Sequence, residues 1–223
     1  GAMSVSAKSH WNAAYDTLSL RNYTIDIPHD EYSFAEFTDT IAAIRGTVAA
    51  LIIEPLVQGA GGLRFYSADI LAEIRRVCRE HDILMIADEI ATGFGRTGSM
   101  FACHEAGIEP DIVCVGKALT GGHMPLAATM CNAKVFDAFL GDDYDKALMH
   151  GPTFMAHAIA CAAANASLDL FEREPRLAQV EAMETHLWDG LRHFKTHAKV
   201  QDVRVKGAIG VVEFKEGALS ADD

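Results

Sequence analysis

Two short apolar runs in the chain each end on an ionisable residue. Residues 83–88 end on Asp88, and residues 111–117 end on Lys117. Near-continuous runs of Val, Ile and Leu are typical of strands in parallel sheets, which are buried on both faces. The pattern therefore predicts two parallel strands that carry an aspartate and a lysine to the carboxyl edge of a sheet, where the ligands of α/β proteins bind.

The surrounding pattern predicts further elements on both sides of these strands. Residues 48–53 form an apolar run that stops at a proline, and Ser67 is a plausible N-cap for a helix with apolar residues at helical spacing up to residue 78. Strand, helix and strand in this order form a βαβ unit with a right-handed crossover. After Lys117 we expect a strand over 125–130 and helices over 133–140, 156–171 and from 175 onward, whereas residues 4–40 are expected to be irregular.

These elements together predict an α/β protein, with a mainly parallel sheet covered on both faces by helices. A length of 223 residues allows one large domain or one and a half, and a hydrophobic content of 50% is sufficient for a substantial core. The sequence contains no internal repeat and no low-complexity segment.

Charge and cysteine usage exclude several classes of function. The formal net charge of −12 and the lack of a basic cluster argue against a nucleic-acid or anionic-membrane partner. There is no apolar run of membrane-spanning length and no signal-peptide pattern, and the five cysteines include no CxxC pair. The histidines show no metal-ligand spacing, so we expect a cytoplasmic protein with reduced thiols and no metal.

An aspartate and a lysine at the same sheet edge match the needs of pyridoxal 5'-phosphate. The lysine can form a Schiff base with the aldehyde of this cofactor, and the carboxylate can keep its pyridine nitrogen protonated so that the ring withdraws electrons. The alternative is an ordinary surface aspartate and an ordinary surface lysine at two strand ends. The residues around Asp88 and Lys117 favour the first interpretation.

Those residues are 88–98, DEIATGFGRTG, and 116–122, GKALTGG. In these segments the chain resembles the class III, fold-type I aminotransferases that depend on pyridoxal phosphate. Residues 53–62, 150–155 and 160–167 extend the resemblance to the subfamily that transfers an amino group from S-adenosylmethionine to 8-amino-7-oxononanoate in biotin synthesis. The similarity covers nearly the whole chain in the same order.

The resemblance implies roles for the residues at the sheet edge. Lys117 would be the catalytic residue, binding the cofactor and the substrate and moving the proton that transamination requires. Asp88 would pair with the pyridine nitrogen. Gln58, which precedes a glycine-rich turn, would approach the ring oxygen of the cofactor, although such a turn is a weak signal.

The resemblance also implies a homodimer with shared active sites that acts on small-molecule substrates. Pro152 and Thr153 would reach the phosphate of the cofactor bound mainly by the other subunit, and Gly151 would line the substrate pocket. The alternative is an ordinary turn before a helix, in which Thr153 acts only as an N-cap.

By the same resemblance, residues 1–172 would belong to the cofactor-binding large domain. Residues 173–223 would form a linker helix and the start of a small C-terminal α/β domain. The first five residues resemble an internal stretch of the family, so we expect an internal fragment of a longer enzyme.

Three functional interpretations remain open at this stage. The first is transfer of an amino group from S-adenosylmethionine to 8-amino-7-oxononanoate, giving 7,8-diaminononanoate. The second is another class III aminotransferase, of the ω-amino-acid or ornithine type, with the same mechanism. The third is a catalytically silent fragment that serves only in dimerisation.

Overall fold

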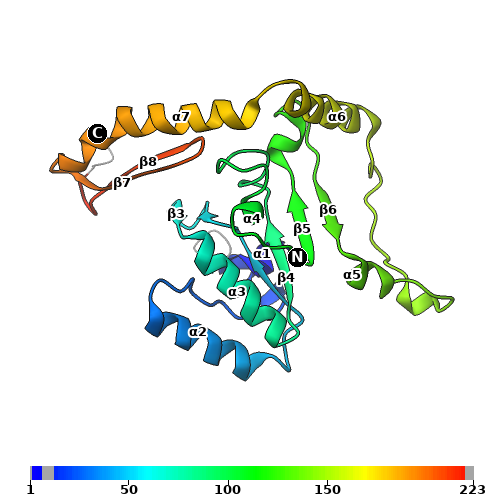
Figure 1. Ribbon diagram of the computed structural model, residues 1–223. Helices are drawn as coiled ribbons and strands as arrows, with labels where there is room; N and C mark the ends of the chain where they lie inside the picture. The colour runs from blue at the N-terminus through cyan, green and yellow to red at the C-terminus, as the bar shows by residue number, and fades with distance from the viewer. Residues whose placement is uncertain (1, 7–12, 219–223) are drawn as a thin grey trace.

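The computed structural model describes residues 2–6 and 13–218. Its central feature is a four-stranded sheet of order β1-β4-β5-β6 (Figure 1). The strands β1 (Ala50–Ile53), β4 (Leu84–Asp88) and β5 (Ile112–Val115) are parallel, and β6 (Ala128–Cys131) is antiparallel to β5. The predicted α/β class with a mainly parallel sheet is confirmed.

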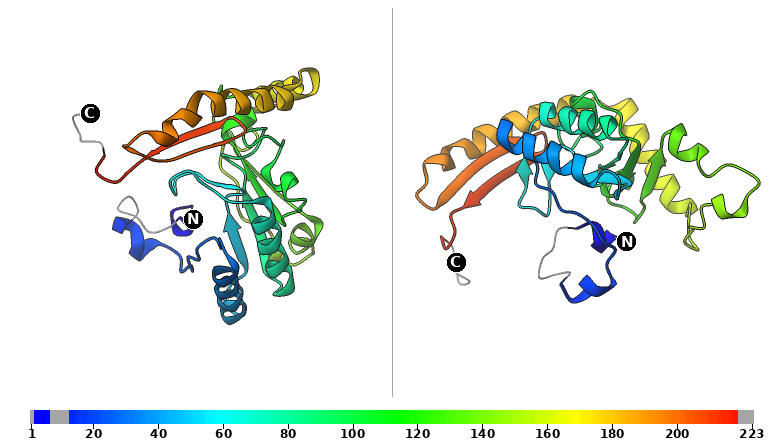
Figure 2. Two further views of the ribbon diagram at one scale, coloured as in Figure 1. Left: turned by 60° about the vertical axis from the view of Figure 1, so that its left-hand side comes forward. Right: turned by 90° about the horizontal axis from the view of Figure 1, so that it is seen from below.

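Two antiparallel pairs lie outside this sheet. The strands β2 (Val57–Gln58) and β3 (Arg64–Phe65) flank the glycine-rich turn, and β7 (Val200–Lys206) and β8 (Ile209–Phe214) form a C-terminal hairpin. Figure 2 shows the hairpin running alongside the last long helix. Helices and turns connect the strands of the three sheets along the chain.

The α-helices and 3-10 helices have the following bounds. They are α1 (Ala2–Val5), η1 (Ala13–Leu18), α2 (Glu31–Ile44), α3 (Ala68–Glu80), α4 (Ala102–Glu105), η2 (Lys117–Thr120), α5 (Ala133–Asp137), η3 (Tyr144–Lys146), α6 (Ala158–Arg173), α7 (Arg176–Leu191) and η4 (Arg192–Thr196). Within the described chain, no helix is long and apolar enough to cross a membrane.

The prediction of an irregular segment over residues 4–40 was wrong at its end, because residues 31–40 belong to α2. Residues 7–12 of that segment lie outside the described part. A capping box starts α2, because the Asp30 carboxylate accepts from the Ser33 N–H at 2.7 Å and the Ser33 hydroxyl accepts from the Asp30 N–H. Phe37 and Ile41, four residues apart, bury one face of the helix. Mixed aromatic and polar residues hid this helical spacing.

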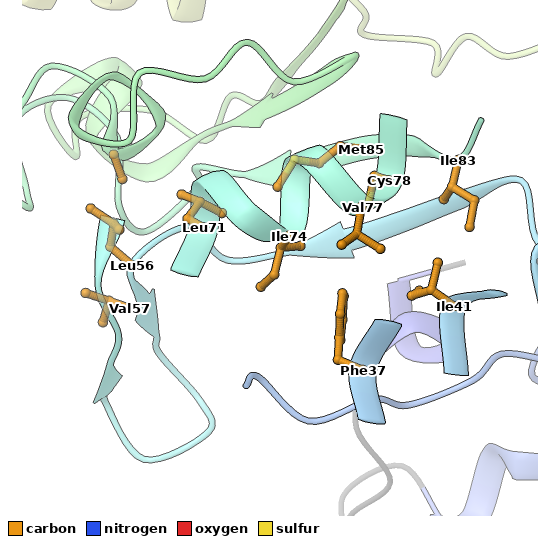
Figure 3. Packing of buried hydrophobic residues seen from close by; sticks show 11 residues of the cluster. Phe37, Ile41, Leu56, Val57, Leu71, Ile74, Val77, Cys78, Ile83 and Met85 are labelled. Atoms are coloured by element: carbon orange, nitrogen blue, oxygen red, sulfur yellow. The ribbon is translucent and has the colours of Figure 1, made fainter. Parts of the chain in front are cut away.

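The main core lies between α2, α3 and one face of the sheet (Figure 3). Ser67 caps α3 as predicted, accepting from the Ile70 N–H at 3.3 Å, and Leu71 and Val77 of that helix are fully buried. Each buried side chain of this size stabilises the fold by about 1.5–3 kcal/mol. The opposite face is open at β1, where Ile52 is 37% exposed, and β6 is exposed on both faces. Helical cover on both faces is thus not complete in the described chain.

A buried ion pair of Arg75 and Asp111 joins α3 to three strands of the main sheet. The Arg75 guanidinium donates to both carboxylate oxygens of Asp111, at 2.6 and 3.2 Å, and both side chains are buried. Asp111 also accepts from the Met85 N–H of β4 at 2.8 Å and from the Asn132 amide after β6 at 2.9 Å. One carboxylate therefore fixes how α3, β4, β5 and β6 meet.

We predict that Asp111→Asn lowers the free energy of unfolding by about 3–5 kcal/mol at neutral pH, since it leaves a buried arginine without a countercharge. Burial raises the pKa of Asp111, but the hydrogen bonds from Arg75, Met85 and Asn132 outweigh this effect and hold the pKa below the ordinary range of an aspartate. A carboxyl with a depressed pKa stabilises the fold above its unfolded pKa, and this contribution is lost as the pH falls through the folded value.

Denaturant unfolding of both proteins between pH 7 and pH 3 checks this prediction. The difference between them should be largest at pH 7 and shrink in acid. Asp82→Asn is the matched control, because Asp82 pairs with Lys134 on the surface, at 2.8 Å with both side chains exposed, and should change stability little. Equal losses in the two variants would contradict the prediction.

Candidate active site

The carboxyl ends of the three parallel strands bring three ionisable residues to one edge of the sheet. Asp88 is the last residue of β4 and pairs with Cys114 of β5, three positions before Lys117. Glu54 directly follows β1 and interacts electrostatically with both Asp88 and Lys117. The structure therefore brings together the two residues that the strand pattern predicted, and adds a third.

Lys117 has an unusual backbone conformation. Its φ of 43° lies in the left-handed region, which costs a non-glycine residue on the order of 1–3 kcal/mol and is concentrated at functional sites. The next turn holds this conformation, because Leu119 donates its N–H to the Gly116 carbonyl at 2.9 Å and is itself buried. The Lys117 side chain is exposed, and within the described chain its ammonium group makes no hydrogen bond or salt bridge.

Asp88 presents a carboxylate with spare hydrogen-bonding capacity. One oxygen accepts from the Ile90 N–H at 3.1 Å, and the other has no partner among the described residues. The next residue, Glu89, is tied to β5 because its N–H donates to the Cys114 carbonyl at 2.9 Å. The aspartate is thus fixed in position while one of its acceptor oxygens has no partner among the described residues.

Glu89 is fully buried, and no cationic side chain among the described residues pairs with it. Its carboxylate accepts from the Thr92 hydroxyl at 2.5 Å and from the Cys103 N–H at 2.9 Å, so it closes the turn that follows Asp88. Burial and the neighbouring Glu89 carboxylate raise the pKa of the Cys103 thiol well above its usual range. This arrangement makes Glu89 a structural anchor.

Glu54 is the site residue whose chemistry the sequence interpretation missed. Burial raises the pKa of Glu54, and so does the negative charge of Asp88. The hydrogen bond from the Gly59 N–H and the positive charge of Lys117 lower it, and the net shift is upward. The Gly59 nitrogen lies 3.1 Å from the Glu54 carboxylate. The available signal was the one used for Asp88, namely an ionisable residue at the end of an apolar run.

Gln58 ends β2, directly before the glycine-rich turn. A Cβ atom added at Gly61 would lie 3.4 Å from the Gln58 Cβ, so the turn folds back over this side chain. No hydrogen bond joins Gln58 to Asp88 or Lys117 in the part of the chain that the structure describes. Its predicted approach to the cofactor stays a prediction.

No hydrogen bond joins Gly151, Pro152 or Thr153 to Lys117 of the same chain among the residues that the structure describes. They belong to an arm, residues 133–157, that extends away from the sheet in Figure 1 and in the right-hand view of Figure 2. All three are exposed. Thr153 is not the cap of the next helix, because α6 begins at Ala158 with His157 as its N-cap, so the alternative role considered for Thr153 was wrong.

A separate hollow of about 430 Å³ lies beside α4, with His104, Glu109 and Asn132 in its lining. It contains none of the predicted site residues. Among the described residues, no group of three His, Cys, Asp or Glu side chains could hold a metal ion.

Comparison with known proteins assigns the family. The family model of the class-III aminotransferases matches residues 2–221 of this chain. The chain is 51% identical over 173 residues to the adenosylmethionine-8-amino-7-oxononanoate aminotransferase of Corynebacterium glutamicum, covering 78% of this chain and 41% of that protein. The enzyme of the same name from Mycobacterium leprae is 45% identical, with coverages of 89% and 46%. The chain thus spans less than half the length of these two relatives.

Solved structures agree with this result. The adenosylmethionine-8-amino-7-oxononanoate aminotransferase of Methanocaldococcus jannaschii has a TM-score of 0.85 and 32% identity, covering 92% of this chain and 48% of that one. A PLP-bound amine transaminase from an uncultivated Pseudomonas species has a TM-score of 0.74 and 41% identity, with coverages of 79% and 40%. Class III aminotransferases depend on pyridoxal phosphate, and this chain belongs to the class-III aminotransferase family.

Proposed function

We propose that the full-length protein is a pyridoxal-phosphate-dependent aminotransferase that transfers an amino group from S-adenosylmethionine to 8-amino-7-oxononanoate. The product would be 7,8-diaminononanoate, for biotin synthesis. The observation that carries the proposal is the meeting of Asp88 and Lys117 at one edge of the sheet, in a chain whose curated relatives bear the name of this activity.

The two residues would divide the work at the cofactor. When bound, pyridoxal phosphate supplies an electron sink for breaking a bond at the substrate's α-carbon. Lys117 would hold the cofactor through Nζ, and the same amine would carry a proton from the substrate's α-carbon to the cofactor. The second oxygen of Asp88 would hold the proton on the ring nitrogen. The exposed lysine and the unpaired carboxylate oxygen fit this ligand.

Glu54 and Gln58 would border the same site. Glu54 lies close enough to Asp88 and Lys117 to interact with both charges, and it holds the start of the glycine-rich turn through the Gly59 N–H. Gln58, one residue before that turn, would place its amide beside the ring oxygen of the cofactor.

The exposed arm supports a homodimer with shared active sites. It carries Tyr144, Leu148, Met149, Phe154 and Met155, all largely exposed, with Phe154 at 78%. A second copy that packs on the arm would remove these apolar side chains from water. In that dimer Pro152 and Thr153 would bind the phosphate of the partner's cofactor, and Gly151 would line its substrate pocket.

A second candidate is an amine or ω-amino-acid transaminase. The solved ω-transaminase from Pseudomonas jessenii is 38% identical to this chain, compared with 32% for the Methanocaldococcus jannaschii enzyme. The mechanism at Lys117 would be the same, and only the amino donor would differ. A silent dimerisation module is less consistent with an intact aspartate and lysine.

The amino donor can be tested in a half-reaction on stoichiometric full-length enzyme. We expect S-adenosylmethionine to remove the visible absorption band of the bound cofactor at least about tenfold faster than ornithine, β-alanine or 4-aminobutyrate, since about 1.4 kcal/mol of selective binding gives that factor. Stopped-flow spectra measure the rates, and Lys117→Ala is the control that should show no conversion. A faster reaction with an ω-amino acid would favour the second candidate.

The shared site can be tested by mixing two inactive variants. Lys117→Ala removes the catalytic amine, and Thr153→Glu places a negative charge where the partner's phosphate would bind. If each site takes Lys117 from one subunit and Thr153 from the other, the mixed dimer regains one of its two sites. Transaminase activity of doubly tagged heterodimers measures this. A heterodimer no more active than its two parents would exclude sharing.

A further inference from the structure

The glycine-rich turn beside the candidate site contains strained backbone. Leu56 and Leu63, which flank the turn, have φ values of 63° and 50°, in the left-handed region that leucine rarely adopts. Leu56 is fully buried, so packing holds it in place, whereas Leu63 is 37% exposed. Strain of this kind persists only where neighbouring groups enforce it. Contacts other than side-chain burial must therefore hold Leu63.

Arg204 of the C-terminal hairpin supplies such contacts. Its Nε donates to the Leu63 carbonyl at 2.8 Å and its Nη2 donates to the Gly62 carbonyl at 2.9 Å. The guanidinium therefore binds the two consecutive carbonyls at the end of the turn. Residues 63 and 204 are 141 positions apart, so this is a contact between distant parts of the chain.

The guanidinium is itself fixed from the other side. Its Nη1 donates to Asp202 at 2.9 Å and to Glu213 at 2.5 Å, and the Arg204 side chain is only 16% exposed. Its central carbon also lies 5.7 Å from the centre of the Phe65 ring. The ammonium group of a lysine is a compact point charge and cannot reproduce the four hydrogen bonds that the planar guanidinium makes here.

The start of the turn is held by a residue of the candidate site. The Gly59 N–H donates to Glu54, which interacts with Asp88 and Lys117. Within the turn, the Leu63 N–H donates to the Gly59 carbonyl at 3.1 Å. The turn is thus fixed at one end from the sheet edge and at the other end from the C-terminal hairpin.

We propose that Arg204 is a positioning residue that holds the turn over residues 59–63, and Gln58 ahead of it, in the geometry needed for cofactor binding. The proposal rests on the proposed function for the role of Gln58. The C-terminal hairpin, which contributes no predicted catalytic group, would in this way determine the shape of the site.

Three variants of the full-length protein separate this role from general stability. Arg204→Lys keeps the charge but loses the fork. Lys206→Gln is the matched control on the same strand, because Lys206 anchors the hairpin to a different element through Glu105 of α4, at 2.7 Å. Leu63→Gly relieves the left-handed strain at an exposed position. If the function of Arg204 is to hold Leu63 in this conformation, Leu63→Gly should restore cofactor binding in Arg204→Lys.

Two measurements apply to each variant. Hydrogen exchange by mass spectrometry follows the peptide 59–65, and titration with pyridoxal phosphate gives its dissociation constant. We expect Arg204→Lys to speed hydrogen exchange in residues 59–65 and to weaken cofactor binding, each by about tenfold. This factor corresponds to the loss of one charge-assisted hydrogen bond. Lys206→Gln should leave both unchanged, and adding Leu63→Gly to Arg204→Lys should recover most of the cofactor affinity.

The outcomes distinguish this proposal from the proposed function. If the wild-type protein does not bind pyridoxal phosphate, the proposed function fails, while the exchange data still show whether Arg204 holds the turn. Unchanged exchange in 59–65 for Arg204→Lys would overturn the proposal. So would faster exchange with unchanged cofactor affinity, or an affinity loss that Leu63→Gly does not reduce.

Discussion

The parallel pairing of β4 with β5 is the constraint on which the site depends. Because Asp88 pairs with Cys114, the two strands end together and their next residues share one edge of the sheet. Asp111, at the other end of β5, secures this register by binding Arg75 and the Met85 N–H. A shift of one residue in this pairing would turn the side chains of one strand to the opposite face and separate Asp88 from Lys117.

The sequence pattern was sufficient where local chemistry determines an element. The strand carrying Asp88, the strand before Lys117 and the Ser67 cap were predicted because each depends on residues close together in the chain. The helix α2 was missed although its capping box of Asp30 and Ser33 is equally local, because mixed aromatic and polar residues obscure the helical spacing of Phe37 and Ile41. Helix ends were also less accurate, since α5 stops at Asp137 and the predicted helix extended to residue 140.

The candidate site shows the same difference between features set by neighbouring residues and features set by distant ones. Asp88 and Lys117 could be predicted from two apolar runs that each end on an ionisable residue, and the family resemblance supplied their proposed roles. Arg204 could not, because its contact with the glycine-rich turn joins residues 141 positions apart and no periodic pattern encodes it. Gly151, Pro152 and Thr153 stay predictions, because their proposed contacts lie between two chains and not within one.

The central claim is that Lys117 binds the cofactor at the edge of the sheet beside Asp88. Borohydride reduction of the full-length protein with pyridoxal phosphate, followed by peptide mapping, tests it most directly because reduction fixes the cofactor to the lysine that holds it. The account predicts one pyridoxyl group, on Lys117. A label on a different lysine, or no label, would contradict it.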